Sequence, residues 1–312
     1  MDFSLLFNSD VQGSTDLTSG IGSKFNRFLS NIELTSTQKS EASKRHTAVR
    51  ANLENEFIGA KTFIAGSYGK STAIRPPSDL DIMLVLPRSL YSKYTTYAYY
   101  YRNAQSEFLQ EVKRRIQKHY PFTSMRADGQ VIIIEFSGSF SVEIVPCFEA
   151  GLYSQKYLIA DTNSGGSWRE VDPVGESNSL TQSNKITSGN TVRLIKMLKC
   201  WKRYCAVPLK SFHIEILAQR FLANYHYKDK SSTYYDWMIR DFFSWLSNKH
   251  SPWWNTVTHP STLESIEIGG EWKSKTDSAL ARAKKAIEFA QSEMPVHAKL
   301  EWQKIFGTNF SG

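Results

Sequence analysis

Two aspartates in the first half of the chain have the spacing of a metal site. Asp79 and Asp81 lie two positions apart within PSDLDI, residues 77–82. Successive side chains of a strand point to opposite faces, so the two carboxylates share one face while Leu80 and Ile82 point into the core. Adjacent carboxylates repel each other unless a cation lies between them, which favours a divalent-metal site. A solvated strand start with two surface aspartates is the alternative interpretation.

A third acid lies in an apolar segment further along the chain. Glu143 is the only charged residue of VEIVP, residues 142–146, and burying a lone carboxylate is costly unless it binds a cation. Glu135 stands in a similar apolar segment and is the rival for this role. Two acids on one strand and one on its neighbour can hold two Mg²⁺ ions about 3.5 to 4 Å apart, which activate an attacking hydroxyl and stabilise a leaving pyrophosphate. We therefore expect Asp79, Asp81 and Glu143 to be catalytic metal ligands.

The segment GSYGKST, residues 66–72, ends like a phosphate-binding P-loop but lacks its spacing. A P-loop has a glycine five positions before its Gly-Lys pair, because its backbone amides must wrap the phosphates closely. That position is Ile64 here. The chain also shows no strand and helix alternation long enough for a doubly wound parallel sheet. We therefore exclude a P-loop NTPase, and Lys70 is left with a surface charge, a carboxylate partner or a phosphate contact as its role.

The elements around these residues predict a mixed α+β lobe. A capping box formed by Thr35 and Gln38 predicts a helix from Thr35 to about Phe57. A long helix crowded with tyrosines is expected over residues 89–119. Short apolar runs predict strands at residues 62–65, 80–86, 131–136 and 141–146, of which the last two form a hairpin.

The second half of the chain predicts a helical lobe. Residues 153–189 are rich in Ser, Asn, Gly and Asp, which predicts a long irregular crossing between two lobes. Helices are expected at residues 190–205, 211–225, 234–247 and 273–292, with a short one near Lys299. The sequence thus predicts a mixed lobe over residues 1–185 and a helical lobe over residues 186–312.

Composition limits the class of protein. The 312 residues carry a net charge of +8 with a pI near 9.2, which favours an anionic partner. No window reaches eighteen apolar residues and no basic leader precedes an apolar run, so we expect a cytoplasmic protein that does not enter the membrane. Cys147, Cys200 and Cys205 lack the spacing of zinc ligands, which predicts buried free thiols.

The combined motifs resemble a known superfamily. Gly66-Ser67, then Asp79-x-Asp81, then Glu143 in a later strand look like the pattern of polymerase-beta-like nucleotidyltransferases. FIAGSYGKSTAIRPPSDLDIMLVL, residues 63–86, more closely resembles the bacterial relatives of cyclic GMP-AMP synthase, the CD-NTases of anti-phage signalling, and segments at 128–130, 142–149 and 161–168 agree. The resemblance covers roughly residues 35–225. Glu143 stands where the family often has aspartate, and its longer side chain can still reach a metal.

The resemblance implies how the site is built. The active site would lie in the cleft between a nucleotidyltransferase lobe with a small mixed sheet and the helical lobe. Gly66 and Ser67 would hold the triphosphate of the incoming nucleotide at a helix amino end. Lys199 and Ser211 would also contact phosphate. A solvated basic helix face is the alternative for Lys199, and a helix N-cap is the alternative for Ser211.

The resemblance also implies a reaction. It is the metal-dependent, template-independent synthesis of a cyclic di- or trinucleotide second messenger from NTPs, with release of pyrophosphate. Two Mg²⁺ ions, or Mn²⁺ in vitro, would be the cofactor, and a cyclic-nucleotide effector would act downstream in anti-phage (CBASS) signalling. Nucleic acid is not expected to be required, because the zinc-binding insertion of the animal DNA sensor is absent from the sequence. A linear RNA or protein nucleotidyltransferase and an inactive nucleic-acid-binding homologue are the alternatives.

The last residues have two interpretations. FGTNFSG, residues 306–312, carries no charge and follows the last helical pattern, which is typical of a frayed tail. In some CD-NTase systems a ubiquitin-activating-like partner joins the carboxyl end of the enzyme to a target. Gly312 is small enough to enter such an adenylation site, so conjugation at Gly312 is the second interpretation.

Overall fold

The computed structural model describes residues 20–96, 103–136, 140–151, 155–249 and 255–311. They form two compact units. The first, which we call the sheet unit, comprises Leu34–Ala73 and Pro77–Ser177. The second, the helical unit, comprises the described residues up to Glu33, Ile74–Pro76 and the chain from Asn178 onward. Among the described helices, none combines the length and the apolarity that a membrane span requires.

The sheet unit is built on a mixed sheet. Its central strands follow the order β1 (Lys61–Ile64), β2 (Leu80–Val85), β5 (Val142–Glu149), β4 (Val131–Glu135) and β3 (Ser124–Asp128). β6 (Tyr157–Asp161) pairs with β5 and with β7 (Ser167–Val171). β2 and β5 are parallel, and the other pairs are antiparallel. The predicted strands and the hairpin of β4 with β5 are therefore confirmed.

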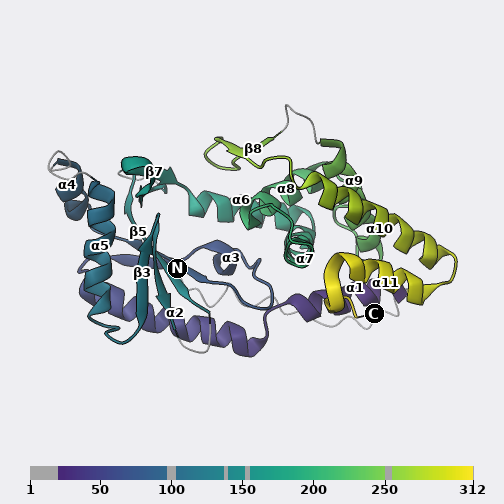
Figure 1. The fold of residues 1–312 in the computed structure, drawn as a ribbon, viewed down its shortest axis with the longest axis horizontal. Helices are drawn as coiled ribbons and strands as arrows, with labels where there is room; N and C mark the ends of the chain where they lie inside the picture. The colour runs from purple at the N-terminus through teal and green to yellow at the C-terminus, as the bar shows by residue number, and fades with distance from the viewer. Residues whose placement is uncertain (1–19, 97–102, 137–139, 152–154, 250–254, 312) are drawn as a thin grey trace. The chain divides into compact units, whose positions relative to one another are not determined.

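Helices cover one face of this sheet (Figure 1). α2 (Ser36–Glu56) begins with the predicted capping box, in which the Gln38 amide donates to Thr35 Oγ1 at 3.1 Å and the Thr35 amide donates to Gln38 Oε1 at 3.0 Å. Leu53 of α2 and Phe108 of α5 (Ala104–Gln117) share one core with Leu80 of β2. This core fixes which face of β2 is left for polar side chains.

The tyrosine-rich segment differs from the expected single helix. It holds α4 (Arg88–Thr96) and α5, and residues 97–102 between them, with most of the tyrosines, lie outside the described residues. Asn103 begins the second helix, because its side chain accepts a hydrogen bond from the Ser106 amide at 2.9 Å. An asparagine N-cap is a start signal within the segment that the sequence analysis read as continuous.

The expected irregular crossing over residues 153–189 is wrong. The described part of this segment contains β6, β7 and α6 (Pro173–Ile186), which runs from the sheet unit into the helical unit. Ile159 of β6 stands opposite Cys147 of β5, and both are buried. Pairing with an existing strand outweighed the weak local propensity of the sequence, because strand preference depends on neighbouring strands more than on composition.

The helical unit contains the helices expected beyond residue 189, which are α7 (Asn190–Tyr204), α8 (Ser211–Ala223), α9 (Tyr235–Lys249), α10 (Lys273–Gln291) and α11 (Pro295–Phe306). It also contains α1 (Gly20–Ile32), a helix that was not expected. A small hairpin of β8 (Thr256–Thr258) and β9 (Ser265–Glu267) was not expected. The units also divide the chain differently from the expected boundary at residue 185, because α1 packs in the helical unit.

An aromatic cluster joins the two ends of the helical unit. The rings of Phe25 and Phe310 lie 5.1 Å apart, and those of Phe28 and Phe306 lie 4.5 Å apart. Phe310 is fully buried, so the tail expected to fray is anchored at least to this residue. Gly312 lies outside the described residues.

We expect Phe310→Ala to destabilise the protein by about 3 to 5 kcal/mol, because it removes a buried ring and leaves a cavity beside Phe25 and Phe28. Thr308→Ala is the control, since Thr308 is exposed on the same turn and should change the stability by less than about 0.5 kcal/mol. Unfolding in urea measures both. If Phe310→Ala left the free energy of unfolding unchanged, the tail would contribute nothing to the stability of the core.

Candidate active site

The three acids lie on one face because β2 and β5 run side by side. Asp81 stands directly opposite Glu143 in the parallel pair. The Leu80 amide donates to the Ser141 carbonyl at 3.0 Å, so the pairing extends back toward Asp79. Leu80, between the aspartates, is fully buried in the core on the other face. The pairing thus places Asp81 beside Glu143, and Asp79 is near enough for its charge, like that of Asp81, to raise the pKa of Glu143.

The electrostatics of this face disfavour three ionised carboxylates. Burial raises the pKa of Glu143 to about 7, with further contributions from the charges of Asp81 and Asp79. Arg126 opposes the rise but does not cancel it. The Ser141 hydroxyl donates a hydrogen bond to Asp79 Oδ1 and orients that carboxylate. The site therefore concentrates negative charge that a cation would stabilise.

Glu135, the rival for the third position, is placed differently. Ile133 of β4 stands opposite Glu143, so Glu135 lies two residues further along the strand. Its side chain is 51% exposed, and its carboxylate lies 3.9 Å from Arg126 Nε. Glu143 is partly buried and stands next to Asp81. Glu135, in contrast, is in contact with solvent and lies near the positively charged Arg126. The geometry favours Glu143 as the third acid.

Gly66 lets the backbone touch the carboxylate of Asp81. It lies in the left-handed region with φ +58°, and a Cβ there would fall 1.8 Å from Asp81 Oδ2. It begins α3 (Gly66–Gly69), a single turn whose first amides have no partner within the helix. Ser67 Oγ is buried and, within the described residues, lacks a hydrogen-bond partner. A buried hydroxyl without a partner thus lies one residue from the glycine that contacts Asp81.

Two residues at this face escaped the sequence analysis. Ser141 stands two positions before Glu143 on the same side of the strand, and that spacing was the signal that could have found it. Tyr68 packs against Phe140 with its hydroxyl buried, and burial together with the charge of Asp79 raises the pKa of Tyr68 to about 12. No sequence signal distinguishes Tyr68 from an ordinary core tyrosine.

Lys70 has a carboxylate partner. Its Nζ lies 2.8 Å from Glu176 Oε2, and both side chains are largely buried. Of the three roles that the sequence left open, the structure places Lys70 in this ion pair.

Lys199 and Ser211 belong to the helical unit. Lys199 Nζ lies 2.7 Å from Glu215 Oε1, and both side chains are less than a tenth exposed, at 7% and 5%. Lys199 is therefore not on a solvated face. Ser211 is the first residue of α8, whereas Lys210 holds the N-cap position, its amide donating to His213 Nδ1 at 3.3 Å. Phosphate contact by Lys199 and Ser211 stays a prediction.

The acids of the sheet unit suit a magnesium ion. Within the described residues, no three His, Cys, Asp or Glu side chains are already gathered closely enough to hold a metal. Mg²⁺ prefers one or two carboxylates together with substrate phosphates, rather than a complete protein cage. Asp81 and Glu143 repel each other across neighbouring strands, and the unpartnered Ser67 hydroxyl lies one residue from Gly66, which touches Asp81. These residues fit a metal that arrives with a phosphate ligand.

Comparison with known proteins gives this geometry a family. Residues 20–184, more than half of the chain, match the Second Messenger Oligonucleotide or Dinucleotide Synthetase domain. The chain belongs to this family. It is a CD-NTase of the kind that includes DncV, and therefore a nucleotidyltransferase, so the resemblance drawn from its motifs is confirmed.

Relatives of this CD-NTase cover most of its length. A probable cyclic nucleotide synthase of Bacillus cereus (strain VD146) is 22% identical over 342 residues, covering 92% of this chain and 97% of the relative. A cyclic AMP-AMP-AMP synthase of an Acinetobacter species is 24% identical over 218 residues, covering 65% and 59%. The structure of Vibrio cholerae DncV cyclic AMP-GMP synthase, in complex with the linear intermediate 5′ pppA(3′,5′)pG, has a TM-score of 0.75 at 11% identity, covering 94% and 96%. The predicted α+β nucleotidyltransferase fold is confirmed.

The raised pKa of Glu143 predicts how its replacement changes stability with pH. Its folded pKa lies above the ordinary value of 4.5, so Glu143 lowers the stability of the folded state increasingly as pH rises from about 4.5 to about 7, and by a constant amount above that. In EDTA, Glu143→Gln should stabilise the CD-NTase by about 1 kcal/mol near pH 8, a figure discounted because the carboxyl is only partly buried. The gain should be almost lost near pH 4, below the ordinary pKa of 4.5, because Glu143 is then mostly protonated in both the folded and the unfolded chain.

Glu135→Gln is the matched control, since it removes an exposed carboxylate from the same sheet. Urea unfolding at both pH values measures the difference between each variant and the unaltered protein. A gain in Glu143→Gln that is equal at both pH values, or one shared by Glu135→Gln, would contradict the repulsion described above.

Proposed function

We propose that this CD-NTase joins NTPs into a cyclic di- or trinucleotide and releases pyrophosphate at each bond. The observation that carries the proposal is the placement of Asp81 opposite Glu143, with the backbone of Gly66 against the Asp81 carboxylate. Carboxylates that repel each other, near the unpartnered Ser67 hydroxyl, are suited to a metal-bound polyphosphate.

The residues of the site have separate roles in this proposal. Asp79, Asp81 and Glu143 would hold two Mg²⁺ ions, which when bound activate the acceptor hydroxyl and neutralise the leaving pyrophosphate. Ser141 orients the Asp79 carboxylate through its hydroxyl. The Ser67 hydroxyl donates to a phosphate oxygen of the incoming nucleotide, which would satisfy a group that is otherwise buried without a partner in the described structure. Gly66 leaves room for this approach, because any side chain there would strike Asp81.

The relatives support a cyclic product formed through a linear intermediate. The Acinetobacter relative is named for a cyclic trinucleotide, and the Vibrio enzyme for a cyclic dinucleotide. The Vibrio structure contains a linear dinucleotide that retains its triphosphate. In the present chain the same site would make the linear product first and close the ring second.

The wider setting also belongs to the proposal. Synthesis in the cytoplasm is expected from composition, independence from nucleic acid from the missing zinc-binding insertion, and signalling to a cyclic-nucleotide effector in anti-phage defence from the resemblance. Conjugation at Gly312 by a ubiquitin-activating-like partner stays a prediction.

The test is to incubate the purified chain with radiolabelled NTPs and Mg²⁺, then treat with phosphatase and separate the products by chromatography. Small labelled products that resist phosphatase are expected, because a cyclic nucleotide has no terminal phosphate. Label on protein or on long RNA would support linear transfer instead. No product with either Mg²⁺ or Mn²⁺ would support the inactive homologue.

Replacing the metal-binding acids should stop synthesis without unfolding the protein. Asp79→Asn with Asp81→Asn, and Glu143→Gln separately, should each lower the rate at least about a hundredfold, because each removes charge from the metals without changing side-chain volume. Glu135→Gln is the matched control and should keep most activity, since its carboxylate faces Arg126. Comparable loss in Glu135→Gln, or product from the aspartate double variant, would contradict these assignments.

The predicted phosphate contact of Lys199 needs a test that preserves the fold. Lys199→Ala alone would remove the ammonium group beside the buried Glu215 carboxylate and cost about 3 to 5 kcal/mol. Lys199→Met with Glu215→Gln removes both charges and should fold. If Lys199 binds the triphosphate, this double variant should raise the KM for NTPs more than it lowers kcat, since the contact exists before and during the reaction. Glu215→Gln alone, which keeps the ammonium group, is the control and should retain the KM of the unaltered protein.

A further inference from the structure

Three residues between the two halves of the candidate active site belong to the other unit. Ile74–Pro76, which we call the strap, is part of the helical unit, whereas Ala73 before it and Pro77 after it belong to the sheet unit. The chain therefore leaves the sheet unit and returns to it within three residues. Ser67 precedes the strap and Asp79 follows it, so the strap connects the predicted phosphate contact to the first of the acids.

The strap is held on one side by α1 and by the residue after it. The Arg75 amide donates to the Ile32 carbonyl at 2.7 Å, and Arg75 Nη2 donates to the Ser30 carbonyl at 2.5 Å. Ile74 forms an antiparallel bridge with Glu33, and its side chain is buried in the core of the helical unit. Backbone and side-chain contacts therefore both fix the strap on this side.

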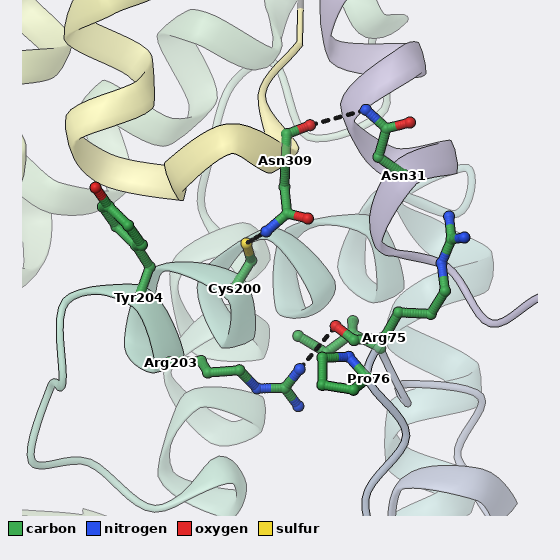
Figure 2. Close-up of a pocket in the computed structure, with 8 residues that line it drawn as sticks. Asn31, Arg75, Pro76, Cys200, Arg203, Tyr204 and Asn309 are labelled. Atoms are coloured by element: carbon green, nitrogen blue, oxygen red, sulfur yellow. Dashed lines mark hydrogen bonds between the residues drawn. The ribbon is translucent and has the colours of Figure 1, made fainter.

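Helix α7 holds the strap from another direction. Arg203 Nη1 donates to the Arg75 carbonyl at 2.7 Å, while the Arg75 guanidinium extends the other way, toward α1 (Figure 2). Lys196 Nζ of α7 lies 2.6 Å from Oε1 of Glu33, the residue that bridges to the strap. α1 and α7 share one core, so the strap is fixed between two helices that are themselves packed together.

Both ends of the strap lead directly into the candidate site. The Thr72 and Ala73 amides donate to the Ser67 carbonyl, at 2.9 and 3.2 Å. Asp79 is the third residue after the strap. Since each residue has only two soft backbone dihedrals, so short a connection has few that could absorb a displacement. A strap of fixed conformation therefore sets the separation between the backbone of Ser67 and that of Asp79.

We propose that Arg75 and Arg203 are positioning residues, which fix the strap so that Ser67 and Asp79 keep the spacing that a metal-bound triphosphate requires. They act through the backbone and need no contact with the nucleotide. The proposal rests on the proposed function of the acids, whereas the restraint of the strap can be measured without it. The effect is large in principle, because a misplacement of about 1 Å can lower a rate about a hundredfold.

The restraint is tested by hydrogen exchange of the full chain without nucleotide or metal. Arg203→Met should speed exchange about fivefold at the amides of Thr72, Ala73 and Leu80, because it removes one hydrogen bond that holds the strap beside them. Arg75→Met removes the bond to the Ser30 carbonyl and should act in the same way.

The pattern of exchange separates positioning from general loosening. Amides of α2 and β4 should exchange at the rate of the unaltered protein in both variants, because the core of the sheet unit keeps its contacts. Arg27→Met is the matched control, since it removes an exposed arginine of α1. It should leave exchange at Thr72, Ala73 and Leu80 unchanged.

Kinetics with NTPs and Mg²⁺ test the effect on the reaction. Arg203→Met should lower kcat about tenfold and change KM less than about twofold, because it displaces a metal-binding acid and removes no nucleotide contact. Arg203→Lys keeps a donor for the Arg75 carbonyl and should restore most of kcat. Arg27→Met should match the unaltered protein in both constants.

Three outcomes would overturn the proposal. One is unchanged exchange at Thr72, Ala73 and Leu80 in both strap variants, which would mean that the arginines do not restrain the strap. Another is equal kcat in Arg203→Met and Arg27→Met. The third is a raised KM with unchanged kcat, which would indicate direct binding of the nucleotide. A chain that makes no product at all would end the proposed function, whereas exchange would still decide the restraint.

Discussion

The candidate site depends on the parallel pairing of β2 with β5. This register places Asp81 opposite Glu143 and buries Leu80 and Ile82 on the other face. A slip of one residue in either strand would turn its acids into the apolar core, where a lone carboxylate is costly. The core formed with α2 and α5 therefore holds the acids at the surface of the sheet. Rigid apolar packing on one side maintains charge repulsion on the other.

The protein treats its buried charges in two ways. Lys70 with Glu176 and Lys199 with Glu215 are pairs in which each charge is offset by its neighbour. Asp81 and Glu143 carry charge of the same sign, so neither offsets the other, and their repulsion adds to the effect of burial in raising the pKa of Glu143. Stability would favour an amide at position 143, so retention of the acid agrees with a role that requires its charge. Paired charges support structure, whereas the repulsion between Asp81 and Glu143 is of a kind that a bound cation would relieve.

Local signals carried most of what the sequence could predict. The capping box at Thr35, the alternation through Asp79 and Asp81, and the helical periodicity of α7 each depend on neighbouring residues, and each prediction matched the structure. Two of the failures came from contacts between distant segments, whereas the Asn103 N-cap was a local signal that was passed over. β6 forms because β5 offers it an edge, and Phe310 is anchored by rings of α1. The partner of Lys199, Glu215, belongs to another helix, so the sequence around Lys199 could not indicate that this lysine is buried.

The helical unit is built from segments that come before and after the sheet unit in the sequence, so its folding depends on the order of synthesis. α1 is synthesised long before α11, yet its Phe25 and Phe28 pack against Trp302, Phe306 and Phe310 of the last described turns. The sheet unit is complete by Ser177 and can fold while those partners are still unmade. During that interval the apolar side of α1 is left without its final cover. Slow translation or early termination beyond Ser177 would therefore leave the aromatic side chains of α1 exposed, which makes α1 a segment at which a chaperone could bind the nascent chain.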